Sequence, residues 1–376
     1  MFVLPRGASP VRTNQPSTSH VCSEYEEAWV GFWRRLSCVV IAALVLETFA
    51  RAAQVPARPV PCTFPASELE WLQRALHGWE QVSREYLRTE PTPLPWIVLF
   101  DASCVWHLNP DSHPGSEPVA IPTNLTFAGA AVPVRALGHE RTVLLPSGVP
   151  LSIEMKASTS LYQNGQSAFF VMAMPSVWQS REVSGPTRAE YLQGVFSHEM
   201  THVRLLVAIN RRVRELAVTN DLVYPINDDV IQSEFQRVDG FEAAFNRERD
   251  QFYRAALEAD PEKRRPLIAR GLEMARRRHA RYFTGANTVY AELETLFLTL
   301  EGVGQWAAYQ LTQARAAGKE HEALRLVRDN RRFWSQDEGL ALFLLIDATV
   351  PGWQSRIFSP TPASPFALLE EALAHR

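Results

Sequence analysis

Residues 192–206 read Leu-Gln-Gly-Val-Phe-Ser-His-Glu-Met-Thr-His-Val-Arg-Leu-Leu. Within this stretch His198 and His202 are four positions apart, and Glu199 lies between them. Side chains four apart lie on one face of an α-helix, so both imidazoles can reach a single ion while the carboxylate lies beside it. The stretch therefore predicts a helix that carries two zinc ligands and a general base.

The flanking residues predict where this helix begins. Ser184-Gly185-Pro186 interrupts the chain, and Thr187 followed by Glu190 forms a capping box. Apolar residues then recur at helical spacing on the side of the two histidines: Leu192, Val195, Phe196, Met200, Val203 and Leu206. A helix with two ordinary core histidines is the alternative, and the capped, amphipathic pattern favours the metal site.

A catalytic zinc ion takes three protein ligands, so a third is expected downstream. Glu301 is our choice, because it is a carboxylate within an apolar helical pattern from Thr288 to Gln313 and needs a partner there. Glu294 lies on roughly the same helix face and remains an alternative. Glu338 is another alternative, although an acid favoured by a helix N-terminus explains it as well. Asp221 is expected to cap or turn its loop.

These residues resemble the zincin metallopeptidases, in particular the gluzincin-like branch, whose third ligand is a Glu on a later helix. The resemblance covers two short pieces of the chain and implies that His198, His202 and Glu301 hold one zinc ion and that Glu199 is the base. The Glu-Gly pair at Glu301, followed by a small residue and an aromatic one, is common around the third ligand. In thermolysin-like enzymes the third ligand lies much closer to the second His than in this chain.

The chemistry expected from these groups is hydrolysis of a peptide or other amide bond. Glu199 would take a proton from the attacking water and pass it to the leaving amine. A donor to the developing oxyanion is also needed, and Tyr290, Tyr309 and His279 are the candidates. Each of them also fits an ordinary role, either as a buried ring or, for His279, on a solvated basic face.

The N-terminal residues predict export. Basic Trp33-Arg34-Arg35 precedes an apolar run from Leu36 to Leu46 and then Ala50-Arg51-Ala52-Ala53, the order found in secretory signal peptides. We expect cleavage after Ala52 or Ala53, a translation start near Val30, and a periplasmic or extracellular protein. The apolar run is short for a membrane span, and an uncleaved anchor is the alternative.

Cysteine usage agrees with export. Cys22 and Cys38 lie in the expected leader, which leaves Cys62 and Cys104 as a pair in the mature chain. An oxidising compartment would let them form a disulfide, and two free buried thiols are the alternative.

Composition restricts the partners. The 376-residue chain is 46% hydrophobic with a net charge of −3, which gives no electrostatic reason to bind nucleic acid. We expect a peptide or protein substrate. The basic residues from Lys263 to Arg281 are expected on a solvated helix face, and the acidic group of Asp228, Asp229, Glu234 and Asp239 is expected at the surface, since it lacks calcium-loop spacing.

The predicted fold class is α+β and mostly helical, with a zincin-like catalytic domain. We expect a leader at 1–53, a Pro-rich linker and helix at 54–94, a β-rich part at 95–185 and a helical part at 186–376. Ser67 and Glu70 predict a capping box for a helix to about Leu87. Strands are expected at 96–100, 142–145 and 168–174, with residues 173–176 either a sheet edge for substrate or a buried strand.

Downstream helices are expected at 241–257, 267–282, 288–314, 321–328 and 338–348. The leading hypothesis is an exported zinc peptidase. The rivals are a zincin-fold envelope binding protein without catalysis and a membrane-anchored helical scaffold without metal.

Overall fold

The computed structural model describes residues 62–374, except for residue 92 and residues 111–118, 163–164, 181–188, 316–319 and 329–331. The expected leader, most of the linker and the capping box at Thr187 lie outside the described residues. The described residues fold as one unit, which is mostly helical and includes a six-stranded sheet. The predicted α+β class is confirmed. Among the helices that the structure describes, none combines the length and apolar character needed to cross a bilayer.

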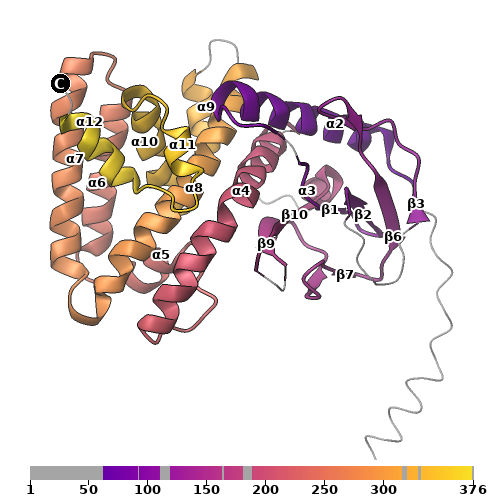
Figure 1. The fold of residues 1–376 in the computed structure, drawn as a ribbon, viewed down its shortest axis with the longest axis horizontal. Coiled ribbons are helices and arrows are strands. Elements are labelled where there is room, and N and C mark those ends of the chain that lie inside the picture. Colours follow the sequence, from indigo (N-terminus) through magenta and orange to yellow (C-terminus); the bar gives the residue numbers. More distant parts are fainter. Residues whose placement is uncertain are drawn as a thin grey trace, which may run out of the picture. The chain divides into compact units, whose positions relative to one another are not determined.

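The main sheet has the strand order β3-β6-β2-β1-β10-β9 (Figure 1). Its only parallel pair, within the described residues, is β1 with β10, and the other neighbours are antiparallel. The strands are β1 (Ile97–Phe100), β2 (Cys104–Leu108), β3 (Val119–Ala120), β6 (Val134–Gly138), β9 (Ala157–Leu161) and β10 (Ala168–Ala173). Two hairpins accompany it, formed by β4 (Thr126–Phe127) with β5 (Ala130–Ala131) and by β7 (Thr142–Leu144) with β8 (Pro150–Ser152).

Alternation along the strands gives the sheet two apolar faces. Phe170 and Met172 of β10 pack in the core that includes Trp71 and Phe196 of the neighbouring helices. Phe169 of β10 points to the opposite face, where the β7–β8 hairpin covers it. Because both faces are covered, the central strands are apolar at almost every position.

The position of the sheet edge corrects one expectation. Residues 173–176 are not an edge, because β10 lies between β1 and β9 and the chain turns directly into a helix at Pro175. The edge strand next to β10 is β9, whose sequence Ala-Ser-Thr-Ser-Leu is only half-buried, and β3 forms the other edge. A strand of small polar residues has weak hydrophobic patterning, so the sequence did not reveal it.

The helices expected from the sequence are present in the predicted order, with boundaries shifted by a few residues (Figure 1). The helices at 175–180, 230–235, 354–357 and 365–374 were not predicted. The described helices and helical turns are α2 (Ala66–Gln81), continued by a π-helical turn (Val82–Tyr86), α3 (Pro175–Ser180), α4 (Ala189–Thr219), α5 (Val230–Phe235), α6 (Phe241–Ala256), α7 (Pro261–Tyr282), a 3-10 turn (Gly285–Thr288), α8 (Val289–Arg315), α9 (Glu320–Val327), α10 (Trp334–Thr349), α11 (Gln354–Ile357) and α12 (Pro365–Ala374).

The start of α2 also differs from the prediction. The residue before the helix is Pro65, and no side chain caps its first turn, so Ser67 and Glu70 form no capping box. Glu68 in that turn accepts a hydrogen bond from the backbone N–H of Ser176 instead, at 2.9 Å. This contact joins α2 to the start of α3, whereas a capping box would have bonded within the first turn of α2.

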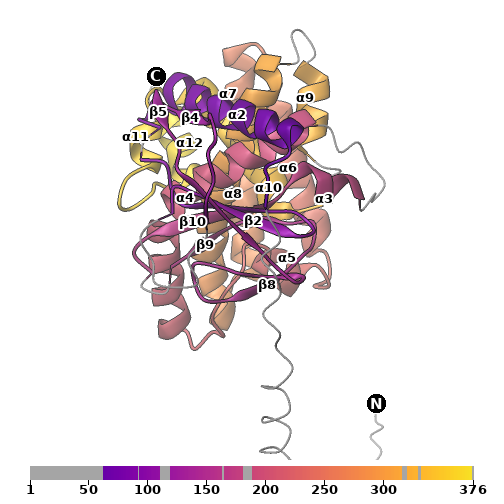
Figure 2. The ribbon, with the colours of Figure 1, turned by 90° about the vertical axis from the view of Figure 1, so that its right-hand side faces the viewer.

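Helix α4 joins the two parts of the unit. One side of α4 packs on β9 and β10, and the other side packs on α8 (Figure 1). Figure 2, seen from the side of the sheet, shows the strands with helices behind them and α2 crossing above. The stretch of α4 that carries His198, Glu199 and His202 therefore lies where the sheet and the helical part meet.

Helices α8 and α10 approach each other through two glycines. A Cβ atom built on Gly302 would lie 2.7 Å from the backbone of Gly339, and one built on Gly339 would lie 2.5 Å from Cα of Gly302. No side chain fits in so short a distance. The crossing brings Glu301 and Glu338, the residues that precede the two glycines, into neighbouring parts of the core.

Candidate metal centre

Two turns of α4 present the predicted ligands side by side. The His198 and His202 rings have centroids 4.3 Å apart, and both residues are buried at 6% and 7% exposure. Their helix carries Phe196 and Met200 into the apolar core, which fixes its rotation. The histidines consequently face α8, as the four-residue spacing predicts.

Helix α8 supplies the third group. Glu301 has one oxygen 3.3 Å from His198 Nε2 and the other 3.5 Å from His202 Nε2. One ligand atom from each of the three residues lies within 4.8 Å of the others, and no other described His, Cys, Asp or Glu residues form such a group. The structure therefore brings together our first choice of ligands.

The polar atoms of the group fit a cation. His202 Nε2 and one oxygen of Glu301 are buried and make no hydrogen bond in the structure. Buried polar atoms normally have a partner, so their convergence is what a metal ion would satisfy. Gly304 keeps the space open, because a Cβ there would lie 2.9 Å from His198 Nδ1 and from His202 Nε2. Two imidazoles and a carboxylate form the donor set of catalytic zinc sites.

The protonation of the group also suits metal binding. Burial lowers the pKa of His198 and lowers that of His202 well below its usual value. Both rings are thus neutral, and neutral imidazole is the form that binds metal. Burial, and then the charge of nearby Asp228, raise the pKa of Glu301 well above its usual value. Glu301 therefore keeps its proton to a higher pH than an ordinary carboxyl does, and a bound cation would displace that proton.

Glu199 lies beside the three ligands. Its carboxylate is 3.7 Å from His202 Nδ1, and burial raises the pKa of Glu199 to about 7 despite the opposing effect of His198. The hydroxyl of Thr159 in β9 donates to Glu199 Oε2 at 2.9 Å. A carboxyl with a pKa near neutrality can both accept and donate a proton.

A cavity of about 630 Å³ opens over these groups between β9, α4 and α8. His198, Glu199, His202 and Glu301 all line it. Thr159 and Ser158 of the sheet edge form one wall. Apolar and polar side chains from other elements complete the lining, among them Trp178, Tyr191, Val195, Phe297, Ala308, Val327, Arg332 and Gln336.

The loop before α5 contributes groups that the sequence analysis placed at the surface. Asp228 and Asp229 line the cavity, and Asp228 hydrogen-bonds to Glu301. Gln336 also hydrogen-bonds to Glu301 and accepts from Gln305 Nε2 at 2.7 Å. The acidic cluster is evident in the sequence. Asp228 is some 70 residues from Glu301, however, so the sequence alone did not predict their contact.

The two alternative ligands lie elsewhere, in a buried ionic cluster. Glu294 accepts two hydrogen bonds from Arg278 and is 2.5 Å from His279 Nε2. Glu338 is fully buried on α10 close to Glu248, whose charge, after burial, raises the pKa of Glu338 well above its usual value. Neither carboxyl belongs to the group formed with His198 and His202, so the geometry favours Glu301 over both alternatives.

The same cluster corrects the interpretation of the basic helix. Arg278 was expected on a solvated face, but its side chain is 1% exposed and pairs with Glu248 and Glu294. Burial alone would raise the pKa of Glu294, and Arg278 and His279 outweigh it and lower that pKa to about 2. One face of α7 is therefore ionic and buried, while Arg277 next to it remains exposed.

The three candidate oxyanion donors do not line the cavity. Tyr290 packs edge-on against Phe235 at 5.1 Å, within a separate aromatic cluster. Tyr309 is buried in the main core, and His279 belongs to the ionic cluster. Tyr191 and Arg332 line the cavity instead. The sequence carried no signal for these two, because only the tertiary fold brings them to the site.

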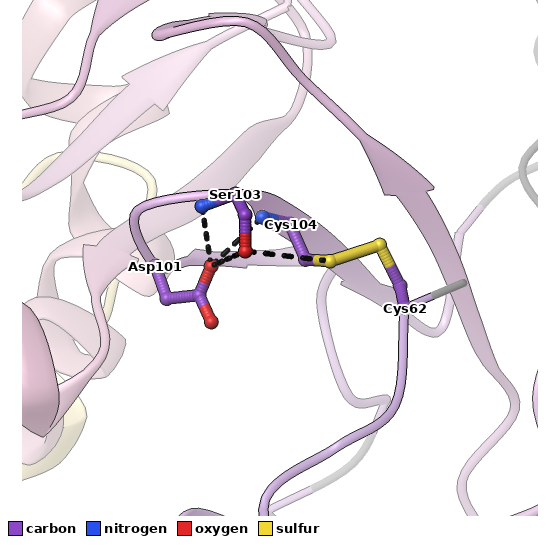
Figure 3. Close-up of a disulfide and its surroundings, with 4 residues drawn as sticks. All are labelled: Cys62, Asp101, Ser103 and Cys104. Carbon is purple, nitrogen blue, oxygen red and sulfur yellow. Dashed lines mark hydrogen bonds between the residues drawn. A yellow bond between two sulfur atoms is a disulfide. The ribbon is translucent and has the colours of Figure 1, made fainter. Parts of the chain in front are cut away.

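Cys62 and Cys104 form a disulfide at the start of β2 (Figure 3). Asp101 closes the adjoining turn, since its Oδ1 accepts from the backbone N–H groups of Ser103 and Cys104 at 2.7 and 2.8 Å. The bond fastens the segment before α2 to the sheet. Neither cysteine lines the cavity beside His198, His202 and Glu301, the candidate metal-binding group.

Comparison of the chain with protein-family models, with curated proteins and with solved structures finds no match. Any functional conclusion therefore depends on the geometry of the site itself.

Proposed function

We propose that this protein is a zinc-dependent metallopeptidase with a zincin-like active site. One observation carries the proposal: His198, His202 and Glu301 converge with unsatisfied polar atoms at a cavity wall, and Glu199 lies next to them. A purely structural cluster would satisfy its own hydrogen bonds. A carboxylate in the position of a base, beside such a group, supports hydrolysis over metal storage.

The residues divide the work of the reaction. When bound to the two histidines and Glu301, zinc supplies Lewis acidity to the attacking water and to the scissile carbonyl. Glu199 takes a proton from that water and returns it to the leaving amine. A pKa of about 7 allows Glu199 to perform both transfers near neutral pH. Asp228 and Gln336 hold Glu301 in place through their hydrogen bonds.

The cavity suits an extended peptide. Its β9 wall is the edge of the sheet, so its backbone N–H and C=O groups can pair with a substrate strand. The opposite wall offers apolar surface from Val195, Phe297 and Ala308 for substrate side chains.

Export is part of the proposal. The Cys62–Cys104 disulfide is of the kind that persists in oxidising compartments. Together with the signal-like order of residues 33–53, it supports a periplasmic or extracellular protein.

The test is the substitution Glu199→Gln in the full-length protein. We expect stoichiometric zinc in both the wild type and the variant, measured by elemental mass spectrometry. Cleavage of a quenched fluorescent peptide library should fall by about 10²- to 10⁴-fold in the variant, because the base is lost. Glu215→Gln is the matched control, since Glu215 is an exposed residue of the same helix.

Three results would count against the proposal in different ways. Unchanged turnover in Glu199→Gln would reject the role of the base. Bound zinc without any cleavage by the wild type would favour a binding protein without catalysis. Purified wild type without zinc, and unable to bind added zinc, would favour a scaffold without metal.

A further inference from the structure

Thr159 is the residue of the sheet that touches the base. Its Oγ1 lies 2.9 Å from Glu199 Oε2 and also 2.9 Å from the backbone carbonyl oxygen of Glu199. Both contacts cross from the edge strand β9 to helix α4 and are partly buried. A single hydroxyl thus faces two acceptors of the same residue.

We propose that Thr159 is a positioning residue that holds the carboxyl group of Glu199 in place. This inference rests on the proposed function, in which Glu199 is the base. It adds a residue, outside the two helices that carry the metal-binding group, on which the reaction depends.

The argument follows from the geometry of the one hydroxyl that threonine offers. Both acceptors, Oε2 and the backbone carbonyl oxygen, belong to Glu199 and lie 2.9 Å from Thr159 Oγ1. A hydroxyl between them fixes the carboxyl group of Glu199 relative to the helix backbone and to the sheet edge, which keeps the base in one orientation.

Proton balance is preserved in this scheme. The proton moves from the attacking water to Glu199 and from Glu199 to the leaving amine. Thr159 keeps its own hydrogen throughout. Its function is therefore orientation and not proton transfer.

The position of Thr159 in the strand makes the contact specific. Thr159 is paired with Phe170 in β10, which packs in the core on the side of α4. Ser160 is paired with Phe169, which packs on the opposite face. The neighbouring hydroxyl therefore points away from the base, and Ser160 offers a matched control on the same strand.

The experiment compares Thr159→Val, Thr159→Ser and Ser160→Ala with the full-length wild type. Valine has nearly the shape of threonine but no hydroxyl, whereas serine keeps it. We expect Thr159→Val to lower kcat on a fluorescent peptide by about 10- to 100-fold, with KM changed by less than about threefold. Thr159→Ser should restore most of kcat, Ser160→Ala should have little effect, and zinc content should stay constant in all variants.

A second measurement does not require turnover. Infrared difference spectra between each protein and the same protein carrying Glu199→Gln isolate the carboxyl bands of Glu199. Loss of a donated hydrogen bond should shift the carboxylate band in Thr159→Val, and the band should stay unchanged in Thr159→Ser and Ser160→Ala.

The two measurements separate the outcomes. An unshifted band in Thr159→Val, or a serine variant as impaired as the valine variant, would overturn the inference. A wild type that cleaves no peptide would end the proposed function. In that case the infrared comparison still decides whether Thr159 donates a hydrogen bond to the carboxyl group of Glu199.

Discussion

At the scale of single residues, the site depends on a missing side chain as much as on its ligands. Gly304 lies against both imidazoles, and a methyl group there would be 2.9 Å from a nitrogen of each ring. Carbon and nitrogen atoms without a bond between them do not approach so closely. The rings are the softer part, so they would move, and the geometry needed for a metal would be lost.

Gly304→Ala should therefore weaken zinc binding by at least about tenfold while the protein stays folded. The measurement is zinc affinity by competition with a chelating dye, together with a circular dichroism melt. Gly194→Ala is the control, because a Cβ there meets Thr312 Oγ1 at 3.4 Å and Ala308 Cβ at 3.6 Å, which are ordinary contacts. Equal zinc affinity in the two variants would contradict the role given to Gly304.

At the scale of secondary-structure elements, one guanidinium connects three helices. Arg278 of α7 pairs with Glu248 of α6 and Glu294 of α8, and all three side chains are almost completely buried. Glu338 of α10 belongs to the same cluster, where burial and then the charge of Glu248 raise its pKa well above the usual value. The ionic contacts hold the helical part together behind the metal-binding group.

Arg278→Ala should destabilise the protein by about 3–5 kcal/mol, because two carboxylates would remain buried without their partner. The measurement is the free energy of unfolding in urea near neutral pH. Arg277→Ala is the control on the same helix, since Arg277 is 78% exposed and forms only a surface ion pair with Glu273. A loss of less than about 1 kcal/mol for Arg278→Ala would show that the cluster contributes little.

At the scale of the whole molecule, metal binding and folding should be linked. The ligands come from α4 and α8, which lie far apart in the sequence, so an ion bound only by the folded state stabilises the entire unit. In zinc-free protein the pKa of Glu301 is raised above its unfolded value. That group favours the folded state at low pH, and its contribution is lost as pH rises toward the folded pKa.

Added zinc should therefore raise Tm more at about pH 8 than at about pH 6, because the ion must displace the proton of Glu301. The two histidines do not oppose this trend, since their pKa values are lowered and both rings are already neutral. The measurement is differential scanning calorimetry with and without zinc. Glu301→Ala should show no such shift, and a zinc effect that is larger at the lower pH would contradict the assigned protonation.

The success of sequence-based prediction follows the range of the interactions involved. His198, Glu199 and His202 form a local pattern on one helix, and the structure places them as predicted. Glu294, Glu301 and Glu338 are all buried carboxyls in apolar helices, and nothing local distinguishes the one that meets the histidines. The residues that each carboxyl contacts determine which of the three meets the histidines, and those residues are distant in the sequence.

Contacts between remote segments explain the remaining differences. Thr159 and Asp228 approach Glu199 and Glu301 only because β9 and the loop before α5 fold onto α4 and α8. Similarly, β10 is apolar at every position because it is an inner strand, and the polar β9 escaped notice as the true edge. The hydrophobic pattern of a sequence identifies helices and strands well, but it predicts poorly which of them lie next to each other in the fold.

The contact between Gly302 and Gly339 has a consequence for how this protein can change. Each glycine excludes any side chain on the other, and neither residue can become smaller to compensate for a substitution at its partner. In a library of random variants both positions should stay invariant even when selection asks only for a folded protein. The contact between the two glycines therefore fixes how α8 and α10 cross, which places Glu301 beside the histidines and Glu338 in the ionic cluster. Related sequences should vary at the surrounding positions while keeping both glycines.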